Sequence, residues 1–407
     1  MKNEIRWIIA ALAMIAASSA RATTFNIEID YMLGGAPSHS HRPTDAELAA
    51  VVQMFACQGH TLNAVISDQI PHYDNLISDP DPNPNTNQGF FNYTGAPNSF
   101  GALRQTYFQH AGQAGWHYCI FCHNYNGTGS SGLAETPGGN LVVAMGSFAN
   151  QVGTPFDRAS SLAHEFGHNL GLTHCGNMNC GLTGTFVPIV PSIMTYFFQL
   201  QGVRTNLICQ GLTVAGGALF KEMDYSHGAM CGLYELSLDE VFGTGMIGVD
   251  WDCNGQVQGT VSHIIRGSQQ GWCGSDGLRL NLSDYDEWSN LNDVTLLRSA
   301  DQMQNMPVST CITADEARMA ERASCPQPTL VSEGFIAARM VYLRQGGPQF
   351  PNGTCPSPYA RLTDAVNSGL PAGSIVFVNG GTFTEPGVVT LSTPMTIYGT
   401  SLSTISH

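Results

Sequence analysis

Hydrophobic and polar positions in the first third of the chain follow two periods, which predict strands and helices in a defined order. Between residues 24 and 32 apolar side chains occupy every second position, as in a strand with one buried face. A helix is predicted from the Pro-Thr-Asp cap at residues 43–45 to about Cys57, because its apolar residues recur at helical spacing. Similar patterns predict strands at residues 61–67, from Tyr107 onward, at 117–123 and at 141–145, and a second helix opening near Asp157.

The second predicted helix carries a regular arrangement of histidines. Residues 164–174 read His-Glu-Phe-Gly-His-Asn-Leu-Gly-Leu-Thr-His. His164 and His168 are four positions apart, so on a helix their imidazoles project from one face and can share one metal ion. Gly171 permits the left-handed turn that ends the helix, and His174 can then approach as a third ligand. Three nitrogen ligands leave one position of a zinc ion open, which a catalytic site requires.

This H-E-x-x-H-x-x-G-x-x-H pattern, with Ser-Ile-Met-Thr-Tyr at residues 192–196, resembles the metzincin clan of zinc endopeptidases. The resemblance implies one catalytic Zn²⁺ ion held by His164, His168 and His174, above a Met-turn at Met194. It is specific over residues 161–196 and extends more loosely over residues 24–300.

The resemblance also implies the chemistry and the partner. Glu165 is expected to act as general base and then general acid on a metal-activated water, in a protease that hydrolyses peptide bonds of a protein or peptide substrate. Tyr196 is expected to stabilise the oxyanion, with simple packing of its ring as the alternative. An extended substrate would pair with an edge strand, for which residues 132–134 and 141–144 are the candidates.

The clan resemblance implies an α+β catalytic domain, with a twisted sheet ahead of the active-site helix. We expect a signal peptide at residues 1–22, the catalytic domain at 23–245, a Cys/Asp-containing extension at 246–330 and a last segment at 331–407. The apolar segment 181–191 is expected to wall the specificity pocket, with an ordinary proline-containing loop as the alternative.

The N-terminus predicts export. Lys2 and Arg6 precede an apolar run at residues 7–17, and residues 20–22 form a small-x-small cleavage site, as in a secretory signal peptide. No other segment approaches the roughly 20 apolar residues that a membrane helix needs. We therefore expect a secreted, extracellular protein without a membrane span. The net charge of −15 reflects few Lys and Arg residues, and the absence of a basic cluster argues against a nucleic-acid partner.

The cysteine count agrees with export, because the 12 cysteines suit several disulfide bonds in an oxidising compartment. Cys119 and Cys122 are interpreted as a disulfide, with a second zinc site (beside His117 and His123) or a redox motif as alternatives. In archaemetzincins a pair spaced like Cys175 and Cys180 binds a second zinc. The C-x-x-C that follows it there is missing here, so a local disulfide is favoured.

Two further patterns lie beyond the predicted catalytic domain. Residues 250–255 open like a calcium loop, but Val261 stands where an EF-hand needs an acidic residue. A Ca²⁺ site would have to be completed by Asp284, Asp286 or Glu287, and a solvated acidic turn is the alternative.

The C-terminal strands predicted at residues 375–378, 388–391 and 395–399 resemble the opening coils of a right-handed parallel β-helix. Because such coils stack on one another, a chain ending at His407 is expected to be truncated or capped by another chain. This segment motivates the alternative function: a cell-surface or glycan-binding protein with a vestigial or latent protease domain.

Overall fold

The structure is a computed structural model. It describes residues 22–80, 89–178, 185–187, 189–203, 223–228, 232–240, 251–252, 254, 259–265, 280–299, 306–314, 340–344, 359–368, 374–379, 381–392, 395–399 and 403–406. Residues 1–21 of the predicted signal peptide lie outside these residues. No helix among them is long and apolar enough to cross a membrane.

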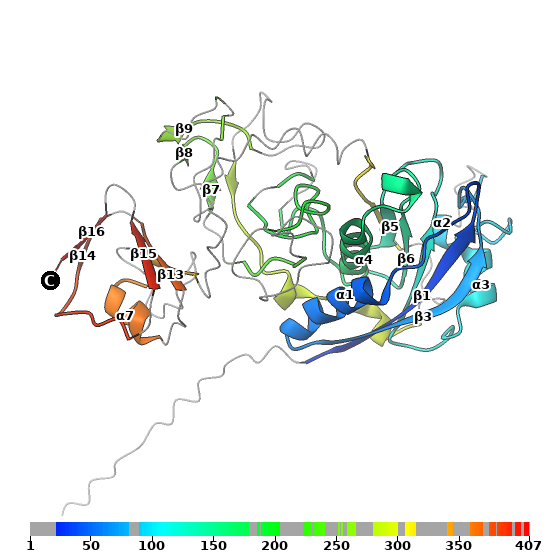
Figure 1. The fold of residues 1–407 in the computed structure, drawn as a ribbon, viewed down its shortest axis with the longest axis horizontal. Helices are drawn as coiled ribbons and strands as arrows, with labels where there is room; N and C mark the ends of the chain where they lie inside the picture. The colour runs from blue at the N-terminus through cyan, green and yellow to red at the C-terminus, as the bar shows by residue number, and fades with distance from the viewer. Residues whose placement is uncertain are drawn as a thin grey trace, which may run out of the picture.

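A twisted mixed sheet of seven strands organises the N-terminal part of the protein (Figure 1). Its strands are β1 (Thr24–Gly34), β2 (His39–Ser40), β3 (Thr61–Pro71), β4 (Trp116–Cys122), β5 (Gly132–Glu135), β6 (Asn140–Ala144) and β11 (Val308–Thr310). The strand order is β11-β5-β6-β4-β1-β2, and β3 also pairs with β1. Strands β1, β3, β4 and β6 are mutually parallel, whereas β2, β5 and β11 pair antiparallel with their neighbours.

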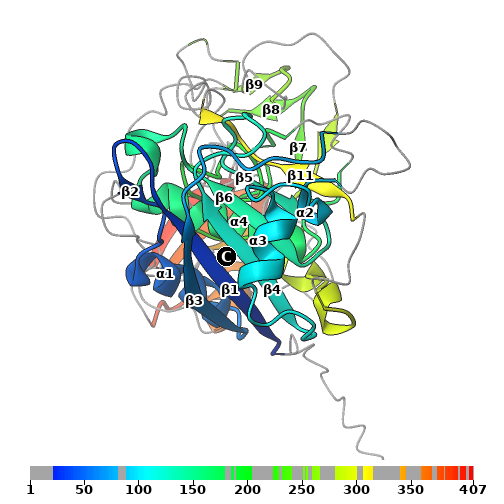
Figure 2. The same cartoon turned by 90° about the vertical axis from the view of Figure 1, so that its right-hand side faces the viewer.

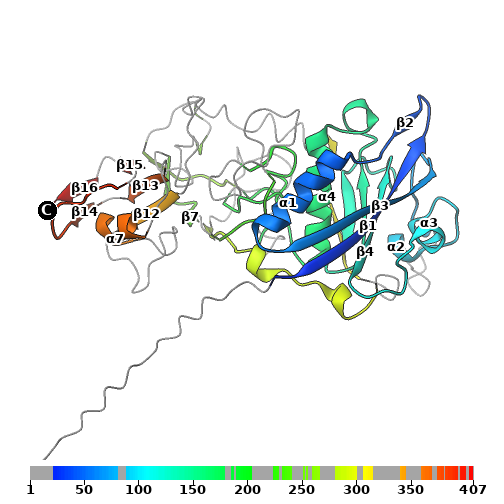
Figure 3. The same cartoon turned by 60° about the horizontal axis from the view of Figure 1, so that its bottom comes forward.

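Helices cover both faces of this sheet, which makes the fold α+β. Helices α1 (Asp45–Cys57) and α4 (Pro155–Asn169) lie on one face, and α2 (Gly89–Asn92) and α3 (Phe100–Tyr107) lie on the other (Figures 2 and 3). Each face has its own apolar core. Phe25, Ile27 and Ile29 of β1 join the core beneath α1 and α4, while Tyr118 and Ile120 of β4 join the core beneath α2 and α3.

Local sequence signals account for the helices that position the candidate site. Thr44 caps α1 in a reciprocal capping box with Glu47, which confirms the helix start predicted at residues 43–45. Helix α4 begins in the same way, because the Thr154 side chain accepts from the Asp157 N–H and the Asp157 carboxylate accepts from the Thr154 N–H. The strands predicted at 24–32, 61–67, 117–123 and 141–145 are confirmed as β1, β3, β4 and β6, with small shifts in their ends.

Two predictions about strands are wrong. No strand begins at Tyr107, which instead ends α3; the Ser99 side chain caps that helix, and Phe100 and Leu103 lie buried along it at helical spacing. Residues 388–391 are not a strand either, and Val388 and Leu391 are exposed. The C-terminal strands at 375–378 and 395–399 are confirmed as β13 and β15.

The predicted disulfide between Cys119 and Cys122 is also wrong, because both thiols are free and buried. The two residues are three positions apart on β4, and side chains alternate between the faces of a strand. Cys119 therefore packs in the core beneath α1 and α4, whereas Cys122 packs in the core on the opposite face. This arrangement separates the thiols by the sheet itself and also rules out a shared metal or redox motif.

Several smaller elements complete the description of this part of the chain. They are the two-stranded pairs β7 (Leu233–Tyr234) with β10 (Asn281–Leu282) and β8 (Leu238–Asp239) with β9 (Thr260–Val261), and 3-10 turns at Ala149–Gln151, Trp288–Asn290 and Val294–Leu296. The C-terminal residues form a separate small core with β12 (Met340–Arg344), α7 (Leu362–Asn367), β13 (Ser374–Asn379), β14 (Gly381–Thr384), β15 (Met395–Gly399) and β16 (Ser403–Ser406). In this segment β12, β13 and β15 form one parallel sheet, and β14 and β16 form another.

Candidate metal centre

The three histidines predicted as zinc ligands converge. His164 and His168 project from α4, and His174 lies in the turn after the helix; the φ of +88° at Gly171 confirms the predicted left-handed turn. The Nε2 atom of His168 lies 3.0 Å from Nε2 of His164 and 2.9 Å from Nε2 of His174. Burial lowers the pKa of all three imidazoles, so each is neutral at pH 7, which is the form that binds metal.

Backbone carbonyls hold two of these rings in the orientation that a metal needs. Nδ1 of His164 lies 2.7 Å from the Ile193 carbonyl oxygen, and Nδ1 of His168 lies 2.8 Å from the Leu172 carbonyl oxygen. Since a carbonyl oxygen only accepts, each Nδ1 must carry the proton. The lone pairs of both Nε2 atoms therefore point toward the common centre, as in metal sites with an ordered outer shell.

The donor set fits a zinc ion. Bonds of 2.0–2.1 Å in tetrahedral geometry place nitrogen ligands about 3.3 Å apart, close to the separations found here. Three neutral imidazoles that face one another without a bridging ion cannot all satisfy their inward lone pairs. The three histidines thus fit the Zn²⁺ ion that the sequence predicts. Their arrangement supports a bound metal ion but does not identify which metal it is.

Glu165 lies beside the triad, fully buried on α4. Its Oε2 atom has no hydrogen-bond partner among the described residues, and burial raises the pKa of this carboxyl well above its ordinary value. Room for the carboxylate comes from Gly132 on β5, where an added Cβ would lie 2.0 Å from Oε1. Helix α4 and strand β5 therefore bring a buried carboxyl group next to the three histidines.

A residue that the sequence did not single out completes the site. The thiol of Cys311 donates a hydrogen bond to Oε1 of Glu165. Its Sγ lies with the ligand atoms of His164, His168 and His174 in one group whose members are all within 4.8 Å of one another. Cys311 is a free, buried cysteine directly after β11. No spacing rule connects it with the helix, since 146 positions separate it from Glu165.

Neither of the two candidate edge strands is an edge of the sheet. Residues 141–144 belong to β6, which lies between β4 and β5 and is therefore not an edge. Residues 132–134 lie in β5, which has β6 on one side and β11 on the other. Strand β11 thus occupies the side of β5 where an added peptide strand would pair.

Met194 packs against α4, the helix that carries His164 and His168. It is fully buried, and a Cβ added to Gly167 of α4 would lie only 2.4 Å from its Sδ atom. The turn is held by Ser192, whose hydroxyl accepts from the Met194 N–H at 3.0 Å. Ile193, within the same turn, supplies the carbonyl that orients His164. The turn therefore fixes both the floor of the site and one ligand.

Tyr196 stands next to the third ligand. Its ring centroid lies 4.6 Å from that of His174 and 6.3 Å from that of His164. The ring also packs against Phe186 in a small apolar cluster, so Tyr196 lies beside His174 and is packed at the same time.

The predicted pocket wall lies partly outside the described residues. Within it, Val187, Ile189 and Val190 are buried in a cluster with Trp251 rather than exposed toward a pocket. Cys175 takes part in a disulfide bond, as does Cys57, whereas Cys180 lies outside the described residues.

The predicted calcium residues are engaged with protein groups. Asp284 accepts from the Ser226 hydroxyl, Asp286 accepts from Ser289, and buried Glu287 accepts from the Ser226 N–H. In the part of the chain that the structure describes, they are not grouped with Asp252 as metal ligands. Asp250, which would begin the calcium loop, lies outside the described residues.

Comparisons with known proteins assign no family to this arrangement. A scan of the chain against models of protein families finds no match, and a search of curated proteins finds no significant match.

Proposed function

We propose that this chain is an exported, zinc-dependent endopeptidase of the metzincin type. The observation that carries the proposal is the convergence of three Nε2 atoms beside a buried glutamate that has an unpartnered oxygen. Cys311 lies in the same group, but its thiol donates to Glu165, and three nitrogen ligands with a carboxyl group beside them favour a catalytic ion over a structural one.

The residues around the site have separable tasks in peptide hydrolysis. A Zn²⁺ ion bound to His164, His168 and His174 would supply Lewis acidity, which polarises a carbonyl and increases the acidity of water. Glu165 takes the proton of the attacking water and then delivers it to the leaving amine. Because Glu165 is buried and held against Gly132, little reorganisation is needed for either transfer. Tyr196, beside His174, donates a hydrogen bond to the developing oxyanion.

An extended peptide would bind along β5. Antiparallel pairing with this strand places the scissile bond next to Glu165, because Gly132 of β5 lies against that carboxylate. Strand β11 holds this position in the structure. Substrate therefore has to replace β11 before it can reach the site.

The test is cleavage of a quenched-fluorescent peptide library by the zinc-loaded full chain, in wild type and in Cys311→Ala, which frees Glu165 from the thiol. Activity should appear in at least one of the two chains. It should fall by about 10²-fold or more when Glu165→Gln is added, while bound zinc is retained. A folded, zinc-loaded Cys311→Ala chain without cleavage of any peptide would refute the proposal.

A second function concerns the C-terminal segment. We infer that residues 340–406 begin a parallel β-helix that attaches the protein to a glycan or cell surface. Successive strands support this, because Ser374 of β13 pairs in parallel with Met395 of β15, and Gly381 of β14 pairs with Ser403 of β16. Sedimentation of the full chain with insoluble polysaccharides should decrease when residues 340–407 are removed. Equal sedimentation of both proteins would argue against a binding role.

A further inference from the structure

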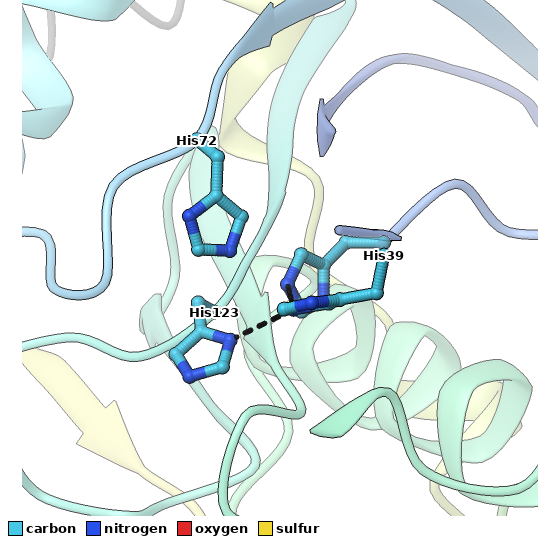
Figure 4. A group of neighbouring side chains, drawn as sticks. His39, His72 and His123 are labelled. Atoms are coloured by element: carbon cyan, nitrogen blue, oxygen red, sulfur yellow. Dashed lines mark hydrogen bonds between the residues drawn. The ribbon is translucent and has the colours of Figure 1, made fainter. Parts of the chain in front are cut away.

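A second cluster of histidines lies at the carboxyl ends of three parallel strands. His39 lies in β2 and His41 directly after it, in the segment that follows β1, while His72 directly follows β3 and His123 directly follows β4. Since β1, β3 and β4 are parallel, their ends meet at one edge of the sheet. Figure 4 shows His39, His72 and His123 from these three segments facing a common centre. None of these residues belongs to the triad on α4.

The four rings are spaced as a metal ion requires. Their ligand atoms all lie within 4.8 Å of one another. Nε2 of His39 lies 3.0 Å from Nε2 of His41 and 3.1 Å from Nδ1 of His123. The six ring-centroid separations fall between 4.7 and 5.6 Å, and six similar separations among four points define a tetrahedron.

We propose that His39, His41, His72 and His123 form a metal site that binds one divalent transition-metal ion, with Zn²⁺ as the best fit. Four imidazoles and no carboxylate ligand favour zinc and its neighbours in the first transition row over Mg²⁺ or Ca²⁺. Tetrahedral spacing favours Zn²⁺ over Cu²⁺, which prefers square-planar geometry. The proposal is independent of the peptidase function.

Contacts on the outer side of the rings determine which nitrogen of each histidine faces the centre of the cluster. Nδ1 of His39 lies 2.8 Å from the Pro37 carbonyl oxygen, so it must donate there and leave Nε2 as the acceptor that faces the cluster. The His72 side chain is 6% exposed, and its Nδ1 lies 3.6 Å from the Asp74 carboxylate. Its Nε2 atom is buried without a hydrogen-bond partner among the described residues. A buried nitrogen of this kind is costly unless something binds it.

Glycines allow the backbone to close around the rings. A Cβ added at Gly35 would lie 2.9 Å from Cε1 of His39 and 3.0 Å from Cε1 of His72. At Gly146 it would lie 2.6 Å from Cδ2 of His123. Such close approaches from two separate loops show that the cluster is tightly enclosed. Burial, and then the neighbouring histidines, lower the pKa of His41 to about 3, which keeps this ring neutral as a ligand must be.

Four protein ligands close the coordination sphere, so the expected role is structural. The ion would join the hairpin after β1 to the ends of β3 and β4. Metal binding would stabilise the folded arrangement of these segments by mass action.

The test counts metal in the full chain after chelator treatment, reloading with Zn²⁺ and desalting. Wild type should hold about two equivalents, one at each cluster. His72→Ala/His123→Ala and His168→Ala should each hold about one, and the combined variant close to none. His263→Ala, a histidine outside both clusters, is the matched control and should match wild type. Wild-type metal content in His72→Ala/His123→Ala would overturn the proposal, as would a wild type that binds only the ion lost in His168→Ala.

Co²⁺ provides a second measurement in case the double variant does not fold. Added to the folded His168→Ala chain, Co²⁺ should develop the visible absorption of tetrahedral nitrogen coordination, without a thiolate charge-transfer band. Retention of the weak spectrum of hydrated Co²⁺ would overturn the proposal.

A separate observation concerns regulation of the first site. Residues 307–314 run alongside β5, and their pairing continues past the end of β11. The Cys311 N–H donates to the Gly132 carbonyl at 3.2 Å, and the Ser131 N–H donates to the Ile312 carbonyl at 2.9 Å. Within β11, Thr310 lies opposite Leu133 in antiparallel register. This is the way an extended peptide adds to a sheet edge.

We infer that residues 307–314 hold the peptidase in a latent state, an inference that rests on the proposed function. The segment occupies the strand position of a substrate, and its Cys311 thiol contacts the general base and reaches the ligand group. Displacement of the segment would free both Glu165 and the backbone of β5 for an extended peptide.

Peptidase activity tests this latency. Activity should rise about tenfold or more in Cys311→Ala, whereas Cys122→Ala, which removes another buried free thiol, should match wild type. Equal activity in wild type and Cys311→Ala would overturn latency while leaving the peptidase intact. Absence of activity in every zinc-loaded, folded chain would instead refute the proposed function.

Discussion

Replacing Gly167 by alanine should destabilise the protein, although the same change in an ordinary helix stabilises it. In the interior of a helix, alanine is favoured over glycine by about 1 kcal/mol. At Gly167, however, the new Cβ would lie 2.4 Å from Sδ of Met194 and 3.1 Å from the hydroxyl oxygen of Tyr225. Nonbonded carbon contacts are favourable at about 3.5–4.0 Å, so α4 and the turn at Met194 would have to separate by roughly 1 Å.

The size of the effect follows from these two opposing contributions. Overpacking a well-filled core costs about 1–3 kcal/mol. The contact between the added Cβ and Sδ of Met194 is among the shortest that a Cβ would make at any glycine of the described structure. After the gain in helix propensity, we expect a net loss of about 1–2 kcal/mol in the free energy of unfolding. Met194→Ala should cost about 2–5 kcal/mol by leaving a cavity. The double variant should be more stable than the sum of the two by about 1–3 kcal/mol, because the alanine Cβ then fills part of that cavity.

Urea unfolding of the chelator-treated full chain measures these differences, with the transition midpoint as the readout and an unchanged m-value as the condition for comparing them. Gly387→Ala is the control, because a Cβ there meets no atom within 4 Å and should change stability by less than about 0.5 kcal/mol. An increase in stability for Gly167→Ala, or strict additivity with Met194→Ala, would show that the Met-turn does not press against the helix and would refute the reasoning.

Three other perturbations have definite expected outcomes. Burial raises the pKa of Glu287 from 4.5 to about 8, so the folded state keeps a proton that the unfolded chain releases. Stability should therefore fall as pH rises between these two values. In Glu287→Gln the midpoint of urea unfolding should depend less on pH over this range. Gly132→Ala places a Cβ 2.0 Å from Oε1 of Glu165, and peptidase activity should drop by about 10²-fold or more with zinc content unchanged. Arg158→Leu leaves buried Glu47 without its ion-pair partner at 2.5 Å and should cost about 3–5 kcal/mol in thermal or urea unfolding.

Short-range patterns were sufficient to predict the elements that position the first site. The alternation of Phe25, Ile27 and Ile29 placed β1 correctly, because one strand face packs into one core. The i, i+4 spacing of His164 and His168 placed two ligands on one side of α4 for an equally local reason. In each case the residues that carry the signal are neighbours in the same element, so their geometry follows from its period.

Long-range contacts were not predictable in this way. His39 and His123 are 84 positions apart, and only the parallel order of β1, β3 and β4 brings them together. Likewise, Cys311 reaches Glu165 only because β11 pairs with β5. The error at Cys119 and Cys122 has a different origin, since a motif that is familiar from turns was applied to a strand, where three positions reverse the face.

The two histidine clusters have different chemical capacities because different groups lie beside them. Beside the triad lie the carboxyl group of Glu165 and the Cys311 thiol that donates to it, so an ion held by the three imidazoles would keep a position for exchange. In the cluster at the strand ends, the carboxylate of Asp74 is 91% exposed and lies 3.6 Å from the outward nitrogen of His72. It therefore cannot transfer a proton to a group bound inside that cluster. Metal loss from the first site should abolish catalysis with a small effect on folding, whereas loss from the second should loosen the ends of β1, β3 and β4 and change catalysis only through that loosening.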